Sequence, residues 1–260
     1  MYVYYQLENF YQNHRRYVQS RDHEQLMGMD RSEEELEKCE PLITEAGQIR
    51  NPCGLIAGSY FNDVISLSTP GKSMDEIGIS WKSDRDVKFK QPDGFDYVVA
   101  DPGVSTDTDC VTQKSTGYRY TTKDGVGYCY FYPRDNQTFY LHEMFPQINP
   151  IDGVTDEHFI VWMRTAALPT FRKLYGTIDS DFKSGDTLEF TVDSNFEVSS
   201  YDASKAMVLS TIGEFGGKNP ALGTAYVVVG SVSLFLGVVF FIKHLNYPRD
   251  TGSKTLLKWA

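Results

Sequence analysis

The most constraining feature of this chain is an uninterrupted stretch of 22 residues without a charged side chain, Ala221 to Ile242, near the C-terminal end. As an α-helix, such a stretch rises roughly 33 Å, and the hydrocarbon core of a bilayer is about 30 Å thick. A helix buried in a large soluble core rarely needs so long an apolar stretch. We therefore expect a transmembrane helix at 221–242, after a large domain at 1–220 and before a short tail at 243–260.

Charge is distributed unequally on the two sides of this helix. The tail carries four basic side chains and one acidic one, a net charge of +3, whereas the rest of the chain carries −13, for a total of −10. Lys and Arg next to a membrane helix favour the cytosolic side. The pattern predicts a cytosolic tail and a large exoplasmic or luminal domain. That acidic domain lacks the basic face that phosphate contacts require, so no nucleic-acid partner is expected.

The chain has four cysteines, all of them in the large domain, and they support this orientation. They are Cys39, Cys53, Cys110 and Cys129. In an oxidising compartment such cysteines form disulfides, and their spacings lack the short pairs of structural zinc sites. Three connectivities are possible. We favour the sequential one, in which each bridge closes a loop of about 15–20 residues, on their separation in sequence.

A glycosylation sequon and the start of the chain also bear on the orientation. Asn136, in Asn-Gln-Thr, would accept a glycan in a lumen. Translocation of a luminal domain needs a signal ahead of it, yet Met1 is followed directly by YVYYQL, without a basic region and an apolar core. We therefore expect a segment to be missing at the N-terminal end. In the competing interpretation the protein is tail-anchored with a cytosolic large domain, its cysteines reduced and its sequon unused.

The large domain has the pattern of a β-rich fold. Residues 187–196 alternate between apolar and polar, and 87–90 repeat this pattern over a shorter length. Two aromatic-rich runs, 118–122 and 128–132, flank a glycine-containing connection and predict a hairpin. We expect a mainly β domain, an antiparallel β-sandwich-like arrangement in two layers with long loops and few short helices.

Several segments carry more local expectations. Asn9 is expected to be the N-cap of a helix over the following residues. Residues 33–37 are expected to form a solvated loop or a short helix, and 94–109 a loop. The β-branched and aromatic residues after His158 favour a strand that runs up to Arg164.

No catalytic or metal-binding motif is found. The five histidines form no H-x-x-x-H or H-E-x-x-H pair, and the chain has neither a G-x-S-x-G elbow nor a phosphate-binding P-loop. Residues 179–184 begin like a calcium loop but carry a cation at the fifth position and serine in place of the turn glycine. We expect a non-enzymatic role without a cofactor or a metal. A glycosidase stays open, because sequence alone cannot place two carboxylates across a sugar.

Long distinctive segments without catalytic logic recur along the whole chain. They are NFYQNHRRYV at 9–18, CEP at 39–41, NPCGLIAGSYFNDV at 51–64, ISW at 79–81, VKF at 87–89, HFIVWMRTAALPTFRKLYG at 158–176 and GGKNPALGTAYVVVGS at 216–231. Together these segments resemble the cell division control protein 50 family, the accessory β-subunits of type IV P-type ATPase lipid flippases.

The resemblance implies an integral membrane glycoprotein with two membrane helices around a disulfide-bonded, β-rich exoplasmic domain. The resemblance places the first of these helices ahead of Tyr2, so we expect it in the segment missing at the N-terminal end. It also implies a non-catalytic role: pairing with the type IV P-type ATPase, allowing it to leave the endoplasmic reticulum, and supporting phospholipid translocation. The implied location is the endoplasmic reticulum, Golgi, endosomes or plasma membrane, with membrane lipids as further partners.

This chain departs from the family pattern at two further places. Residues 94–146 do not follow it, so the second disulfide and the glycan rest on this chain's residues alone. Val64 stands where the family typically continues Asn-Asp-Thr, so a sequon expected there is missing.

Candidate partner-binding residues lie in and just before the membrane helix. Ser233 and Gly237 have the four-residue spacing of a contact between small residues of two helices, and Gly230 lies within two turns of them. Tyr226 marks an alternative contact face. Two further candidates precede Pro220, which is expected to open the helix: Lys218 and Asn219.

Arg164 and Arg172 are candidates in the large domain. Together with Lys173 they could contact acidic exoplasmic loops of a partner, or all three could be solvated or paired within this acidic domain. Two other function classes also stay open: a single-pass receptor or lectin-like ectodomain, and a luminal glycan-processing enzyme anchored by its C-terminus.

Overall fold

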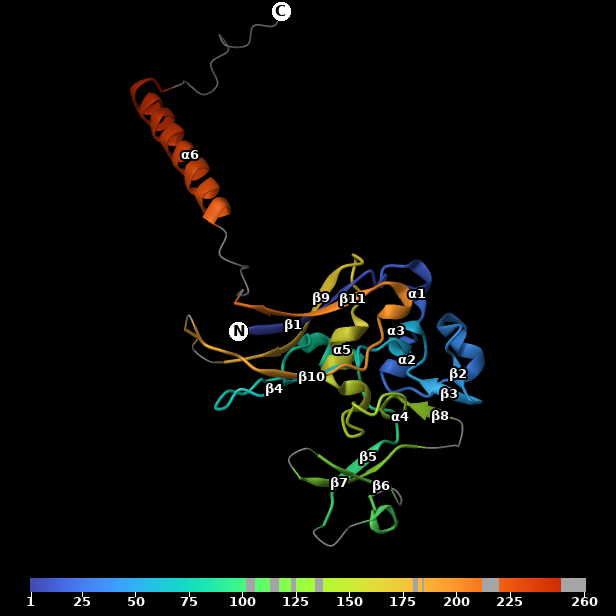
Figure 1. Cartoon of the computed structure of the whole chain (residues 1–260). Coiled ribbons are helices and arrows are strands. Elements are labelled where there is room, and N and C mark those ends of the chain that lie inside the picture. Colours follow the sequence, from blue (N-terminus) through green and yellow to red (C-terminus); the bar gives the residue numbers. More distant parts are fainter. Residues whose placement is uncertain are drawn as a thin grey trace, which may run out of the picture. The chain divides into compact units, whose positions relative to one another are not determined.

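The structure, a computed structural model (Figure 1), describes residues 1–101, 106–112, 117–122, 125–133, 138–179, 182–183, 185–211 and 220–248. The chain divides into two units, Met1–Ser210 and Thr211–Ala260. The described part of the first unit consists mostly of strands with short helices. That of the second is essentially one helix, α6 (Pro220–Asn246).

A three-stranded antiparallel sheet brings the beginning and the end of the first unit together. Its strands are, in order, β11 (Ser204–Ser210), β1 (Tyr2–Glu8) and β9 (Phe171–Thr177). Every second residue of β1 is buried, namely Val3, Tyr5 and Leu7. Tyr5 stacks on Phe61 with ring centroids 3.9 Å apart. The core of the unit therefore lies on one face of this sheet.

The remaining strands form three smaller sheets. They are β10 (Phe190–Asp193) with β4 (Val64–Leu67); β2 (Thr44–Glu45), β3 (Gln48–Asn51) and β8 (Thr138–Tyr140); and β5 (Asp96–Val99), β7 (Gly127–Phe131) and β6 (Tyr118–Thr121). The pairing is antiparallel except between β3 and β8. The predicted hairpin is confirmed by β6 and β7. The mainly β composition is confirmed as well, whereas the two-layer sandwich is not, because the described strands form four small sheets.

Short helices connect these strands. They are α1 (Arg15–Gln19), α2 (His23–Leu26), η1 (Glu33–Cys39), α3 (Leu55–Gly58), η2 (Asp84–Lys88), η3 (Asp107–Asp109), α4 (Leu141–Met144), η4 (Gly153–Thr155), α5 (Glu157–Met163) and η5 (Ser199–Tyr201). The 3₁₀ helix η1 confirms the short-helix alternative for 33–37 and buries Leu36. The η2 segment is a single π-helical turn.

Helix α5 replaces the strand expected up to Arg164. The carboxylate of Asp156 accepts the N–H of Phe159 at 2.8 Å and so caps the helix. The buried side chains recur at helical spacing: Phe159, Ile160, Trp162 and Met163. Trp162 is fully buried and donates its indole N–H to the carbonyl of Ile56 at 2.7 Å. The cap and the helical spacing therefore outweigh the β-branched residues.

Three other local expectations are wrong. Asn9 caps no helix; it has a positive φ of 61° and donates to the carbonyl of Tyr201, and α1 begins only at Arg15. The alternation at 87–90 belongs to η2 and the residues after it rather than to a strand. The expected loop at 94–109 contains strand β5, which pairs with β7.

The two disulfides have the sequential connectivity that the sequence analysis favours. Cys39 bonds to Cys53, and Cys110 bonds to Cys129. The first bridge is fully buried and joins η1 to the residues after β3. Ser20 donates its hydroxyl to the carbonyl of Cys39, and the side-chain carbonyl of Gln25 accepts the N–H of Cys53. The C-terminal end of α1 and helix α2 are thereby tied to the disulfide.

Gly54, next to this disulfide, provides a test of the close packing there. Its φ is +99°, and a Cβ would lie 2.2 Å from the carbonyl oxygen of Ser20. Gly47 has a similar φ of +83° but nothing within 4 Å. We expect Gly47→Ala to cost about 1–2 kcal/mol of unfolding free energy through left-handed strain alone. Gly54→Ala should cost about 1–3 kcal/mol more, because the backbone of Ser20 has to move.

The measurement is urea unfolding of the full chain in detergent, followed by tryptophan fluorescence. Equal losses for the two glycine variants would contradict the close approach between Gly54 and Ser20.

Candidate partner-binding surfaces

The candidate residues of helix α6 share one face, so the expectation that Tyr226 marks an alternative face is wrong. Tyr226, Gly230, Ser233 and Gly237 follow one another at intervals of four, three and four residues, which align on a helix. All four are exposed, and apart from the helix's own backbone nothing lies within 4 Å of a Cβ built on either glycine. This α6 face therefore leaves its backbone open to the approach of another helix. The other candidates before the helix and at the sequon lie outside the described residues: Lys218, Asn219 and Asn136.

Helix α6 is also the membrane-span candidate. Among the described residues it is the one helix long and apolar enough to cross a membrane. It begins at Pro220, as expected, and extends past the predicted end at Ile242 to Asn246.

Arg164 and Arg172 lie in different surroundings. Arg164, just after α5, donates Nε to the carboxylate of Asp84 at 2.5 Å, and its guanidinium lies 4.7 Å from the ring centroid of Trp81. Arg172, on β9, is exposed and donates Nε to the side chain of Gln6 on the neighbouring strand at 2.6 Å. The structure therefore does not gather the two arginines into one site.

Asp84 holds η2 against the end of α5. Only 1% of Asp84 is exposed, and its second carboxylate oxygen accepts from the ammonium group of Lys88 at 2.7 Å. Burial alone would raise the pKa of Asp84, but the hydrogen bonds and charges of Arg164 and Lys88 lower it further, to below its usual value. The carboxylate therefore stays ionised between two cations.

Glu157 holds the preceding segment against the start of α5. Its carboxylate accepts the N–H of Gly78 at 2.8 Å, the N–H and hydroxyl of Ser80 at 2.9 and 2.7 Å, and Nη1 of Arg85 at 2.8 Å. Burial raises the pKa of Glu157, and these hydrogen bonds lower it by more, so the net shift is downward. Residues 78–88 are therefore fastened to both ends of α5.

The fastened segment and the residue before it present large apolar side chains to solvent. Ile77 is 80% exposed, Trp81 66% and Val87 59%. Single exposed apolar residues are common, but three in and next to one anchored segment make it a candidate contact surface. Trp and Arg are the side chains enriched at the energetic centres of protein interfaces. We call Ile77, Trp81, Val87 and Arg164 the Trp81 surface.

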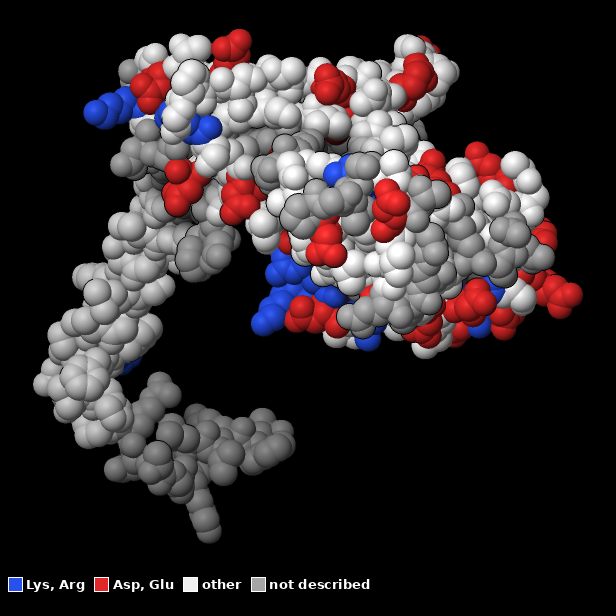
Figure 2. Space-filling model, turned by 90° about the horizontal axis from the view of Figure 1, so that it is seen from below, with Lys and Arg blue, Asp and Glu red and all other residues white. Residues whose placement is uncertain are grey.

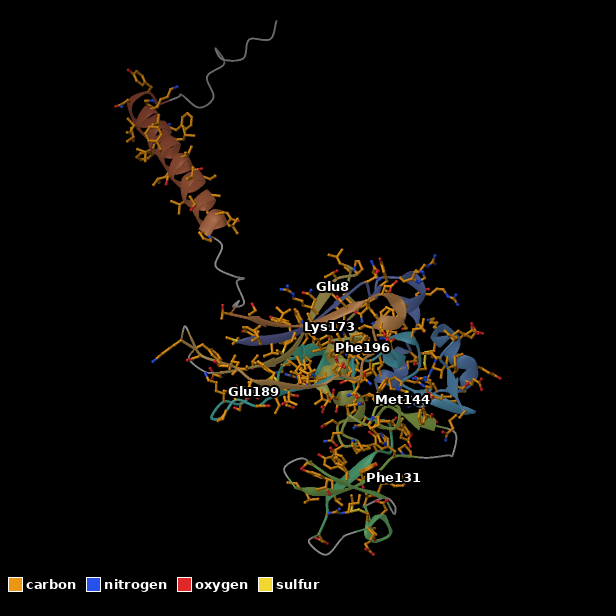
Figure 3. All side chains as sticks on the ribbon, in the orientation of Figure 1. Glu8, Phe131, Met144, Lys173, Glu189 and Phe196 are labelled. Carbon is orange, nitrogen blue, oxygen red and sulfur yellow. A yellow bond between two sulfur atoms is a disulfide. The ribbon has the colours of Figure 1, made fainter. Side chains whose placement is uncertain are left out.

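Lys173 fixes the backbone from which Arg164 projects. Its ammonium group donates to the carbonyls of Val161, Trp162 and Arg164 at 3.0, 2.5 and 2.7 Å. Burial holds its pKa well below the usual range. Figure 3 shows Lys173 within the crowded centre of the first unit. The carbonyls at the C-terminal end of α5 thus have a cation as their partner.

Charge on the outer surface is not uniform. On the face shown in Figure 2, acidic side chains are scattered over the first unit and basic ones gather mainly in one cluster.

Among the described residues, no group of three or more His, Cys, Asp or Glu side chains is arranged to hold a metal ion.

Sequence reasoning missed Trp81, Asp84 and Glu157 as parts of a site. It placed Lys173 wrongly: the expected surface cation is buried and bound to backbone carbonyls. The segments ISW and VKF drew attention to this region, and Asp84 with Lys88 has the spacing of an ion pair on a helix. Nothing in the sequence shows that Asp84 and Lys173 are buried, because their partners come from distant segments.

Comparison with known proteins identifies the family. The family model described as the LEM3 (ligand-effect modulator 3) family / CDC50 family matches residues 1–250. The chain belongs to this family. The resemblance found in the sequence is thereby confirmed.

Relatives cover nearly the whole chain. ALA-interacting subunit 3 of Arabidopsis thaliana is 39% identical over an alignment of 264 positions, which covers 100% of this chain and 64% of the relative. Cell cycle control protein 50A of Bos taurus is 39% identical over 272 residues, 97% of this chain and 66% of the relative. The phospholipid-transporting ATPase accessory subunit CDC50 of Chaetomium thermophilum is 31% identical over an alignment of 273 positions. This alignment covers 98% of this chain and 59% of the relative. The chain spans 59–66% of the length of these relatives.

The anchoring role of Asp84 predicts a pH-dependent loss of stability. Asp84→Asn should lower the free energy of unfolding near neutral pH by about 1–3 kcal/mol, because the buried network loses its negative charge and one of its two acceptor oxygens. Asp86→Asn is the matched control, since Asp86 is exposed in the same turn.

The folded-state pKa of Asp84 lies below its ordinary value of 3.8. The stability that the ionised Asp84 carboxylate gives to the folded state is therefore present above pH 3.8 and is lost as the pH falls through the folded-state pKa. Urea unfolding of the full chain in detergent at several pH values should show the Asp84→Asn and unsubstituted curves converging in acid. A difference that is constant with pH would contradict the role of the charge.

Proposed function

We propose that this protein is a non-catalytic accessory subunit of a phospholipid flippase, associated with a type IV P-type ATPase. The match to the CDC50 family over 1–250 carries the proposal, together with a relative named phospholipid-transporting ATPase accessory subunit. The apolar helix α6 and the disulfide-bonded first unit support it. In this role the protein is needed for export of the ATPase from the endoplasmic reticulum and for phospholipid translocation.

The proposed topology follows from charge and chemistry. Residues 1–220 lie in the exoplasmic space or a lumen, 221–242 cross the membrane, and 243–260 lie in the cytosol. The basic tail favours this orientation. The two disulfides fit an oxidising compartment, where Asn136 would carry a glycan. The compartments proposed are those of the secretory pathway, from the endoplasmic reticulum to the plasma membrane.

Two surfaces would contact the ATPase. In the membrane, the α6 face with its two glycines fits closely against another helix. Outside the membrane, the Trp81 surface offers an aromatic anchor with a guanidinium at 4.7 Å, a combination suited to an acidic loop with apolar residues. Arg172, Lys218 and Asn219 are further proposed contacts.

The experiment that tests the proposed function is purification of the intact protein from mild detergent, followed by mass spectrometry of what accompanies it. We expect a type IV P-type ATPase in stoichiometric amount. Reproducible isolation without any such ATPase, or with a soluble glycan ligand in its place, would contradict the proposal and favour a receptor or lectin.

The α6 face predicts position-dependent effects in the membrane helix. Ser233→Leu and Gly237→Leu should reduce the amount of ATPase that co-purifies, because a large side chain separates the two backbones. Ser231→Leu is the matched control: Ser231 lies on the opposite side of the helix and bonds the carbonyl of Val227 in its own helix. Equal recovery of the ATPase with Ser231→Leu and Ser233→Leu would show that the contact face lies elsewhere.

The Trp81 surface predicts an effect on association without an effect on folding. Trp81→Ala should weaken binding of the ATPase about tenfold or more, as expected for an interface anchor. The unfolding free energy should change by less than about 0.5 kcal/mol, because Trp81 is mostly exposed. Tyr97→Ala, at an exposed aromatic residue of β5, is the control. Equal association of the two variants, measured by titrated co-purification, would exclude Trp81 from the interface.

A further inference from the structure

A concave pocket in the first unit gathers positive charge. It has a volume of about 500 Å³ and lies between the start of α2, η2 and the end of α5. Its charged and titratable lining residues are Arg21, His23, Asp84, Lys88 and Arg164. With His23 neutral, three permanent cations face one carboxylate, and protonation of His23 adds a further positive charge. This is the reverse of the whole chain, whose net charge is −10.

Arg21 is the unusual member of this group, because it is half-buried without a carboxylate partner. Its one hydrogen bond to a described residue joins Nη1 to the carbonyl of Met163, at 3.4 Å. Within the described residues, no carboxylate oxygen lies within 4.0 Å of its guanidinium, whereas other partly buried arginines have one: Arg31 pairs with Glu24, Arg50 with Glu45 and Arg85 with Glu157. Burial also lowers the pKa of Arg21.

Two carboxylates beside these cations, Asp22 and Asp84, are already committed to other groups. Asp22, the neighbour of Arg21, accepts the N–H of Gln25 at 2.8 Å and so caps α2. Asp84 divides its two oxygens between Lys88 and Arg164. Arg164 uses Nε for that bond, so its two terminal amino groups remain as donors. The pocket therefore holds more positive charge than its own carboxylates neutralise.

We propose that this pocket binds the phosphate group of a small molecule. Guanidinium groups donate to phosphate oxygens in a fork, and Lys88 adds a point charge. The apolar part of such a ligand would lie against Leu26, Phe89 and Met163, which complete the lining. Free phosphate and the phosphodiester headgroup of a lipid both carry the negatively charged oxygens that these cations would bind. The inference goes beyond the accessory role and does not depend on it.

The test is a ³¹P NMR titration of the full chain in a phosphate-free maltoside detergent. The two probes are inorganic phosphate and glycerophosphoglycerol, a soluble phosphodiester headgroup. Saturable line broadening is expected for at least one of them. Arg21→Gln should weaken that binding at least about tenfold, because a charge-assisted contact is lost. Arg119→Gln, at an exposed arginine of β6 outside the pocket, should leave it unchanged.

Two controls keep the test decisive. Unfolding midpoints show whether each variant is folded, and Lys88→Gln, at an exposed side chain, should also weaken binding if Arg21→Gln fails to fold. Tighter binding of the phosphodiester would assign the pocket to a lipid headgroup, and tighter binding of inorganic phosphate to free phosphate. Absence of saturable binding by both probes, or equal affinity in the folded variants and the unsubstituted chain, would overturn the proposal. Binding of an acidic peptide alone would overturn it in favour of a protein partner.

His23 gives the pocket an expected pH dependence. His23 also lines a neighbouring pocket, and the charged groups of the two pockets are Arg16, Arg21, Asp22, Glu24, Arg31, Glu35, Glu37, Lys38, Glu40, Asp84, Lys88 and Arg164. Burial and then the neighbouring cations lower the pKa of His23, against an opposing effect of Asp22. A phosphodiester keeps its charge between about pH 5 and 7.5, so its affinity should rise as the pH falls below the usual histidine value of about 6.5. His23→Gln should remove this rise, and its persistence would exclude His23 from the pocket's chemistry.

Discussion

The ammonium group of Lys173 is the constraint on which the first unit's candidate surface depends. It is buried, faces three backbone carbonyls at the end of α5, and lies 4.8 Å from the ring centroid of Trp162. A charge in such a place is tolerated only when its donors are satisfied. Because α5 carries Glu157 at its first residue and ends immediately before Arg164, the position of Lys173 determines where both anchoring side chains stand.

The segment that exposes Trp81 to solvent is held in place by helix α5. The segment that carries Trp81 has little freedom of its own, since Glu157 and Asp84 bind it to both ends of α5. An anchored side chain loses less conformational entropy on association than a mobile one, so its exposed area contributes more fully to binding. The same network supplies Arg164 and Lys88 to the phosphate pocket. The hydrogen bonds between residues 78–88 and the two ends of α5 therefore support both the Trp81 surface and the phosphate pocket.

The sequence predicts those parts of the structure that depend on local pattern. The length and composition of 221–242 predict α6, and aromatic runs around a glycine turn predict the β6–β7 hairpin. Helix α5 was missed because the β-branched residues Ile160 and Val161 suggested a strand, while the capping carboxylate of Asp156 was overlooked. Asp84 and Lys173 could not be recognised, because burial and pairing across distant segments leave no local signal. The parallel pairing of β3 with β8, strands far apart in sequence, escaped prediction for the same reason.

The central claim is that this protein acts through a partner and not by chemistry of its own. A subunit that binds one transport state more tightly by about 1.4 kcal/mol changes the equilibrium between states tenfold. The most direct measurement is ATP turnover and phospholipid transport by the purified flippase with and without this protein, at equal amounts of folded ATPase. The account predicts higher turnover and transport per folded ATPase when the subunit is present. Equal activity per folded ATPase would contradict a role in the transport cycle.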